Sequence, residues 1–178
     1  MIGAGLSAIA MALTQVLTPG PPTADYETLA GFAREGLTLA LLVFSIAAVL
    51  VSRRLGDLPG KGPLLVAIGY GLLVVGVAAG LALREDPEWF AVLGLPGNLI
   101  ASIGFIVAAL AGWRARRIPG WAAMLLGVGG FVAILGSEFG TTVLIGCYWL
   151  WYARWMRRDV TDAEIAASTA VTGSTSTT

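Results

Sequence analysis

The feature that most constrains the fold is a series of long apolar segments, each closed by a short polar turn. The last of them runs from Ser137 to Arg158; it begins beside one acid and ends among aromatic side chains and arginines. A helix needs about 20 apolar residues to cross the hydrocarbon core of a bilayer, and Trp, Tyr, Lys and Arg collect at its ends. Because similar segments recur along the whole chain, we predict a polytopic helical membrane protein.

The composition favours a membrane protein over a soluble domain. Of the 178 residues, 57% are hydrophobic and 12% are charged, and the mean hydropathy is +0.82. Soluble domains have about 25% charged residues. The formal net charge is zero, so charge gives no reason to expect nucleic acid as a partner. Arginine greatly outnumbers lysine, and alanine and glycine are abundant, which favours a bacterial source.

Six spans are predicted, which form one all-α transmembrane bundle over residues 1–158. They are expected at 2–17, 36–52, 63–83, 96–113, 119–135 and 140–156, followed by a polar, largely disordered cytoplasmic tail at 159–178. The first apolar run lacks the basic residues with which a signal peptide begins. We therefore expect it to be retained, and its removal would leave five spans.

Pro96 decides where the fourth span is expected to begin. Proline inside a helix removes a backbone hydrogen bond, whereas proline in the first turn is tolerated. The residues at 87–94 are therefore predicted to form a short interfacial piece, with the helix beginning near Pro96.

Basic residues are distributed unequally between the two sets of loops that six spans create. One set carries nearly all of them, and only Arg34 and Arg84 fall on the other side. Cytoplasmic loops are enriched in Lys and Arg. We therefore expect a multi-pass protein of a bacterial inner membrane with both termini in the cytoplasm.

Several kinds of chemistry are excluded by residues that the chain lacks. It has no histidine, and Cys147 is its single cysteine. His-bound haem, His-containing zinc sites and intrachain disulfides are therefore excluded. No nucleotide-binding motif is present either. We expect no metal, no cofactor and no catalytic residue, and we expect Cys147 to be a small packing residue.

Glu138 is the first candidate functional residue. It stands in a very short hairpin between the last two spans, where an ionisable group is costly unless it is paired or functional. Arg34 and Arg84 are expected on the same outer rim. Three interpretations stay open: a structural ion pair, exposure to headgroups and water, or a proton or cation site.

The second candidate is the run Pro96, Gly97, Asn98, which interrupts an apolar segment. Broken helices line binding sites in transporters. The simpler interpretation is the start of a helix, with Asn98 making local hydrogen bonds. Thr38, Tyr70 and Ser102 are further polar residues within spans, where interhelical hydrogen bonds are expected.

Small residues recur at four-residue spacing in the third and fourth spans, a pattern that lets helices approach closely. Bundle packing within one chain and a face for a homo-oligomer or a partner membrane protein are both consistent with it. The residues are Gly76, Gly80, Gly104, Ala108 and Gly112.

The ends of the spans carry two further patterns. An aromatic group just before Arg157 is predicted to be an interfacial belt: Tyr148, Trp149, Trp151, Tyr152 and Trp155. The cytoplasmic turns each have arginines followed by Pro-Gly, at 53–60 and at 116–120. This suggests an internal repeat, although every cytoplasmic turn needs arginines and helix breakers. Turns that contain arginine can also bind anionic lipid, although the enrichment of arginine in cytoplasmic loops is enough to explain them.

The short Ala/Gly/Leu-rich spans, the arginine turns, the run RRIPGWAAMLLGVGG and the polar tail together resemble small six-span integral membrane proteins of uncharacterised function that are common in actinobacterial genomes. The resemblance covers the whole chain and implies no catalytic residues. We expect a non-enzymatic membrane component that packs against a partner or holds an apolar or lipid-like molecule between its helices. The alternative is a small transporter or channel-forming subunit with a site near the outer rim.

Overall fold

The computed structural model describes residues 1–17, 28–85, 87–135 and 141–157, and every regular element in these ranges is an α-helix. This confirms the predicted all-α class. In chain order the helices are α1 (Ile2–Leu17), α2 (Leu29–Arg54), α3 (Gly62–Leu83), α4 (Phe90–Arg114) and α5 (Gly120–Leu135). A last helix at 142–157 follows, which we call the C-terminal helix.

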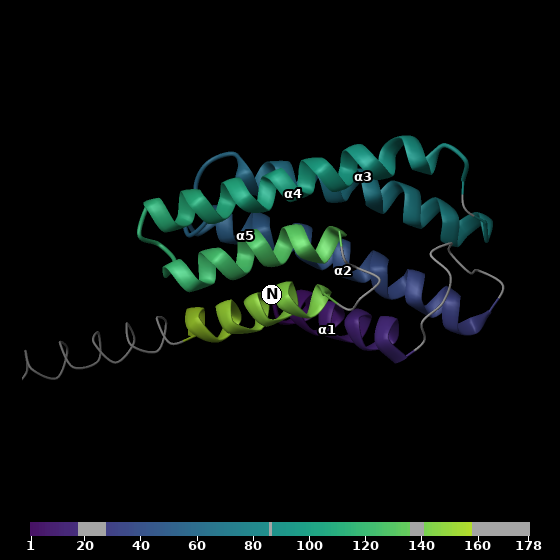
Figure 1. Cartoon of the computed structure of the whole chain (residues 1–178), viewed down its shortest axis with the longest axis horizontal. Coiled ribbons are helices and arrows are strands. Elements are labelled where there is room, and N and C mark those ends of the chain that lie inside the picture. The colour runs from purple at the N-terminus through teal and green to yellow at the C-terminus, as the bar shows by residue number, and fades with distance from the viewer. Residues whose placement is uncertain (18–27, 86, 136–140, 158–178) are drawn as a thin grey trace, which may run out of the picture.

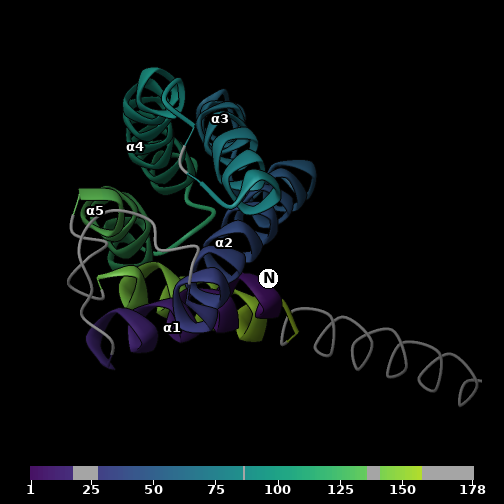
Figure 2. The ribbon, with the colours of Figure 1, turned by 90° about the vertical axis from the view of Figure 1, so that its right-hand side faces the viewer.

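The helices lie side by side along one direction, with the turns gathered at the two ends of the bundle (Figure 1). Seen along its length, α3 and α4 form one side, α1 and the C-terminal helix form the other, and α2 and α5 lie between them (Figure 2). The most extensive contact joins α3 and α4, followed by α2 with α3 and α4 with α5. One continuous core results.

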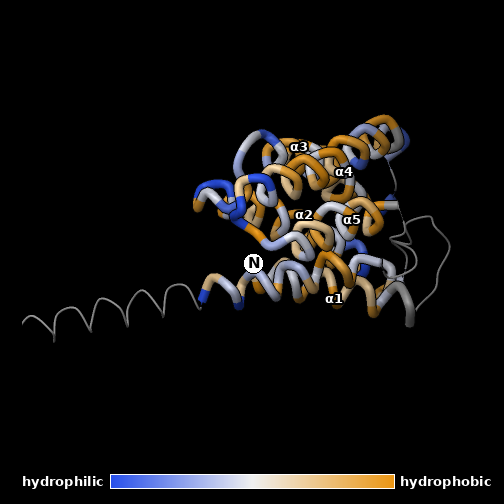
Figure 3. The backbone as a smooth tube through the Cα atoms, turned by 60° about the vertical axis from the view of Figure 1, so that its left-hand side comes forward, coloured by the Kyte–Doolittle hydropathy of each residue, from blue (hydrophilic) through white to orange (hydrophobic). Residues whose placement is uncertain are grey.

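Hydrophobic residues predominate along the helices, and hydrophilic residues gather toward the two ends of the bundle (Figure 3). Three helices, α2, α3 and most of α4, are long and apolar enough to cross a membrane, and only 33–39% of their most apolar stretches is buried. Large apolar side chains therefore face outward, among them Ile68, Val75, Ile103 and Val128. The helices α1 and α5 are shorter. Each has 16 residues, which corresponds to a length of about 24 Å.

The helix α4 begins earlier than the sequence predicts. It starts at Phe90 and contains Pro96 in its second turn. The predicted start near Pro96 is therefore wrong. Proline at this depth removes a single backbone hydrogen bond. The ring of Phe90 also lies where a Cβ on Gly76 would be, and this contact with α3 stabilises the turn before the proline.

Most of the aromatic group in the C-terminal helix is core. Tyr148, Trp149 and Tyr152 have no exposed surface, so the predicted interfacial belt is wrong for these three. The reason is helical periodicity, which places them with Ile145 on the one face that looks into the bundle. Cys147 lies on the opposite face and is exposed, so it is not the packing residue that we expected.

A polar contact fixes the same aromatic group to the turn between α2 and α3. The hydroxyl of Tyr152 donates a hydrogen bond to the carboxylate of Asp57, and the ring of Tyr148 stacks on that of Tyr152 with centroids 5.9 Å apart. Trp151 and Trp155 are half-buried and stack at 5.9 Å. The turn between α2 and α3 is thereby held against the C-terminal helix.

The predicted small packing residues face other parts of the same chain. A Cβ on Gly104 would lie 2.5 Å from the backbone nitrogen of Val66, and one on Gly112 would lie 3.0 Å from the carbonyl oxygen of Asp57. Ala108 lies against Gly62 in the same way, and Gly80 is buried. Helices α3 and α4 consequently approach each other backbone to backbone.

Candidate functional site

A cavity of about 230 Å³ lies among all six helices and is the candidate site. We call it the central cavity. Most of its wall is apolar, with residues such as Leu41, Leu73 and Ile145. Five polar side chains interrupt this wall, and each of α2, α3, α4 and the C-terminal helix provides at least one: Glu35, Thr38, Tyr70, Asn98 and Thr142.

The central cavity occupies one half of the bundle. Asn98 and Thr142 lie near the beginnings of their helices, and Ile134 lies at the end of α5. All of these helix ends lie opposite the arginine turns at 53–60 and 114–120. The cavity is therefore in the half that the charge distribution predicts to be the outer one.

Two polar groups in the cavity wall have no protein partner. Within the described part of the chain, neither the hydroxyl of Tyr70 nor the side-chain amide of Asn98 makes a hydrogen bond. The ring of Tyr70 is 5% exposed, and an edge-on contact with Phe105 at 5.6 Å between centroids holds it in place. Buried polar groups are costly without a partner. Both groups line the cavity, where water or another small molecule can supply the missing hydrogen bonds.

The two threonines of the cavity are already hydrogen-bonded. Thr38 Oγ1 donates to the carbonyl oxygen of Arg34 at 3.0 Å, and Thr142 Oγ1 donates to the carbonyl oxygen of Ala8 at 3.2 Å. A hydroxyl that donates to the backbone still has an oxygen lone pair free. Each threonine can consequently accept a hydrogen bond from a molecule in the cavity.

Two arginines at the end of the bundle opposite the arginine turns lie close to neighbouring side chains. Arg34 Nε lies 3.7 Å from Glu35 Oε1, and the guanidinium carbon of Arg84 lies 5.8 Å from the centre of the Phe32 ring. Glu138, the predicted partner of both arginines, lies outside the described residues. Glu35 therefore provides the carboxylate at this end of the central cavity.

No protein-family model, curated protein or solved structure matches this chain. The site must therefore be interpreted from its own residues. Among the described residues, no group of Asp, Glu, Cys or His is arranged to hold a metal ion.

The run Pro96, Gly97, Asn98 lies inside an unbroken α4 and serves two purposes. Asn98 lines the central cavity. Gly97 lets α4 approach α3, since a Cβ there would lie 2.9 Å from the carbonyl oxygen of Gly69. The local hydrogen bonds predicted for Asn98 and the interhelical bond predicted for Tyr70 are both absent in the described part of the chain.

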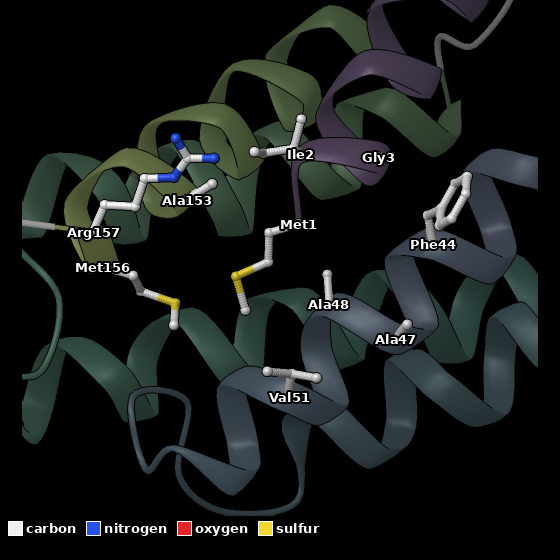
Figure 4. Close-up of a pocket in the computed structure, with 10 residues that line it drawn as sticks. All are labelled: Met1, Ile2, Gly3, Phe44, Ala47, Ala48, Val51, Ala153, Met156 and Arg157. Atoms are coloured by element: carbon white, nitrogen blue, oxygen red, sulfur yellow. The ribbon is translucent and has the colours of Figure 1, made fainter. Parts of the chain in front are cut away.

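A larger cavity, of about 800 Å³, opens at the other half of the bundle between α1, α2 and the C-terminal helix. In it the side chains of Met1 and Met156 point toward each other, with Phe44 and Val51 on α2 (Figure 4). Arg157 is the one charged residue of its wall. Because ligand sites need a few convergent polar groups to orient the ligand, this cavity is a weaker candidate.

Two acids important to the structure were missed by sequence reasoning. Neither Glu35 nor Asp57 was among the candidate residues that the sequence indicated. A signal was available for Asp57, since it is the one acid in the turn LGDLPGKG. No sequence signal distinguishes Glu35 from the acids around it.

Proposed function

We propose that the chain is an integral protein of a bacterial inner membrane, with six helices that cross the bilayer and both termini in the cytoplasm. The apolar exterior, the hydrophilic ends and the three long apolar helices support this proposal. The basic turns support the orientation. Helices α1, α5 and the C-terminal helix are short for a hydrocarbon core of about 30 Å, and they cross it with the help of flanking residues.

Within this bundle the central cavity binds a small molecule, and the protein holds this molecule without transforming it. The observation that carries the proposal is the pair of unpartnered polar groups, on Tyr70 and Asn98, in an otherwise apolar cavity. A non-enzymatic role is supported by the state of Glu35, which is paired with Arg34 and lies beside no histidine, lysine or cysteine of the cavity wall.

The dimensions and chemistry of the cavity restrict the ligand. A volume of about 230 Å³ is several times the roughly 30 Å³ that one water molecule occupies, and it is too small for a phospholipid. Asn98 offers both a donor and an acceptor, and Tyr70 offers a hydroxyl. The Glu35–Arg34 pair has no net charge. The ligand class is therefore a small neutral molecule with one polar head and an apolar body.

A transporter is the second candidate, and the position of the cavity favours it. The cavity lies in the proposed outer half, as an outward-facing site would. Transport also needs a way to the cytoplasm, and the buried residues Phe105, Tyr148 and Trp149 belong to the core that a solute would have to cross. Transport would therefore require these aromatic side chains to repack.

Native mass spectrometry of the protein purified in a mild detergent tests the ligand proposal. We expect wild-type protein to carry a bound small molecule and Asn98→Leu to lose it, because leucine fills the polar end of the cavity. Ile103→Leu, on the exposed face of the same helix, is the matched control and should retain the molecule. If wild-type protein carries no molecule and Asn98→Leu raises Tm, the cavity is an empty packing defect and the proposal is wrong.

A further inference from the structure

An apolar groove runs along the outside of the bundle between α4 and α5. Its volume is about 590 Å³, and its wall includes Ile106, Leu110 and Trp113 from α4 and Met124 and Phe131 from α5. We call it the α4–α5 groove. All of its lining residues are apolar or glycine, so it offers nothing to a polar solute.

The groove adjoins a charged pocket at the proposed cytoplasmic end of the bundle. This second pocket, of about 440 Å³, is lined by Arg116 and Arg117 with Trp155. Trp113 and Gly120 line both spaces. The apolar groove and the charged pocket, which we call the arginine pocket, therefore adjoin each other.

The positive charge of the arginine pocket is not neutralised by the described part of the protein. Neither Arg116 nor Arg117 has an acidic partner within 4.0 Å among the described residues. Arginine binds phosphate oxygens through a rigid fork of N–H donors. An apolar groove that ends at two such residues matches a molecule with an acyl chain and a phosphate.

The backbone conformation at Arg116 is one that favours glycine, which indicates that the arginine side chain has a role at this position. Its φ is 54°, in the left-handed region that favours glycine. The turn after α2 has the same pattern of backbone hydrogen bonds as the turn after α4. After α2, Gly56 N donates to Arg53 O and Asp57 N donates to Ser52 O. After α4, Arg116 N donates to Trp113 O and Arg117 N donates to Gly112 O. In that turn the left-handed position is Gly56, with a φ of 84°. Arginine is thus present where this turn favours glycine.

The length of the groove matches one leaflet of a bilayer. From Gly120 to Phe131 the rise along α5 is about 16 Å at 1.5 Å per residue. The hydrocarbon core is about 30 Å thick, so each leaflet contributes about half of that thickness. The groove accommodates one acyl chain of the cytoplasmic leaflet.

We propose that the α4–α5 groove and the arginine pocket together bind one anionic phospholipid of the cytoplasmic leaflet. An acyl chain lies in the groove, the phosphate lies between Arg116 and Arg117, and Trp113 lies at the boundary between hydrocarbon and headgroup. This inference rests on the membrane orientation proposed above and is independent of the central cavity.

The test uses the full chain in nanodiscs of equal parts phosphatidylglycerol and phosphatidylcholine, with native mass spectrometry to identify the lipids retained. We expect wild-type protein to retain at least fivefold more phosphatidylglycerol. Arg116→Gly should abolish this preference while Tm stays equal or rises, because glycine relieves the backbone strain. Arg54→Gln, which removes one charge from the equivalent turn, is the control and should keep the preference. Equal losses in both variants would mean diffuse surface attraction and would overturn the proposal.

A second variant separates the groove from the charge. Leu110→Trp fills the groove and leaves the arginines unchanged, so we expect it to lose the lipid as well. Displacement of the lipid by soluble glycerol phosphate would mean that the pocket binds a free phosphate, which would overturn the acyl-chain assignment. Protein that remains in solution without detergent would refute the membrane proposal itself, whereas embedded protein with no lipid preference would refute only this inference.

Discussion

The residue with the clearest energetic role is Tyr152, whose hydroxyl donates to the carboxylate of Asp57 in the turn between α2 and α3. Its neighbour Tyr148 is equally buried, but the hydroxyl of Tyr148 has no hydrogen-bond partner in the described part of the protein. Two buried tyrosines one helical turn apart therefore differ in whether the hydroxyl has a partner. This difference separates the contribution of a hydrogen bond from that of an aromatic ring.

Replacement of Tyr152 by phenylalanine should lower the stability of the protein in detergent by about 1.5–3 kcal/mol, because it leaves a carboxylate without its donor. Tyr148→Phe should be neutral or slightly stabilising, since it removes an unsatisfied buried hydroxyl. The measurement is thermal or denaturant unfolding of both variants in the same detergent. Equal losses of stability in both would mean that the Asp57 contact contributes nothing.

At the scale of helices, the close approach of α3 and α4 organises the bundle. Gly69 on α3 faces Ala101 and Gly97 on α4, and a Cβ on Gly69 would lie 2.5 Å from the backbone of both. Two residues further along α3, a Cβ on Gly71 would meet nothing within 4 Å. The two glycines therefore provide a matched pair.

Gly69→Ala should destabilise the protein by at least about 2 kcal/mol, because backbone atoms of α4 would have to move to make room for the methyl group. Gly71→Ala should be neutral or stabilising by up to about 1 kcal/mol, since alanine favours the helix more than glycine does. Unfolding curves of the two variants check this prediction. A loss at Gly71 as large as at Gly69 would contradict the packing described for α3 and α4.

Helix positions were largely predictable from the sequence, whereas the inward faces of the helices were not. Long apolar segments and arginine turns indicate helices directly, because a bilayer demands them. A helix that is apolar on every side, however, gives no indication of which face is buried. The burial of Tyr148 and Trp149 and the exposure of Cys147 therefore appeared only in the structure. The start of α4 depends on Phe90 meeting Gly76, a tertiary contact that local rules for proline do not include.

The candidate site was predicted only in part, for a related reason. The sequence indicated Asn98 as a candidate because it is polar in an apolar segment, and Asn98 does line the central cavity. Its functional neighbours Tyr70 and Glu35 come from other helices. Their convergence depends on how the helices are arranged around one another, which no local sequence pattern encodes.

At the scale of the whole molecule, the two ends of the bundle differ in character. The half with the arginine turns contains the buried aromatic group and the Asp57 contact, together with the cavity of about 800 Å³ between α1, α2 and the C-terminal helix. The other half contains the central cavity, with the Glu35–Arg34 pair close to it. We propose that six helices cross a bilayer around a largely apolar cavity with polar groups in its wall, and that this cavity is reached from the outer face.

Cysteine accessibility tests that claim most directly, because Cys147 is the single native cysteine. In a Cys147→Ser background, three variants would be treated with a membrane-impermeant maleimide applied to the outer face of intact membranes: Asn98→Cys in the cavity, Ile103→Cys on the exposed apolar face of α4, and Arg116→Cys in a cytoplasmic turn. The account predicts labelling of Asn98→Cys from outside, no labelling of Ile103→Cys, and labelling of Arg116→Cys only after the membrane is permeabilised. Labelling of Arg116→Cys from outside, or of Ile103→Cys as readily as Asn98→Cys, would contradict it.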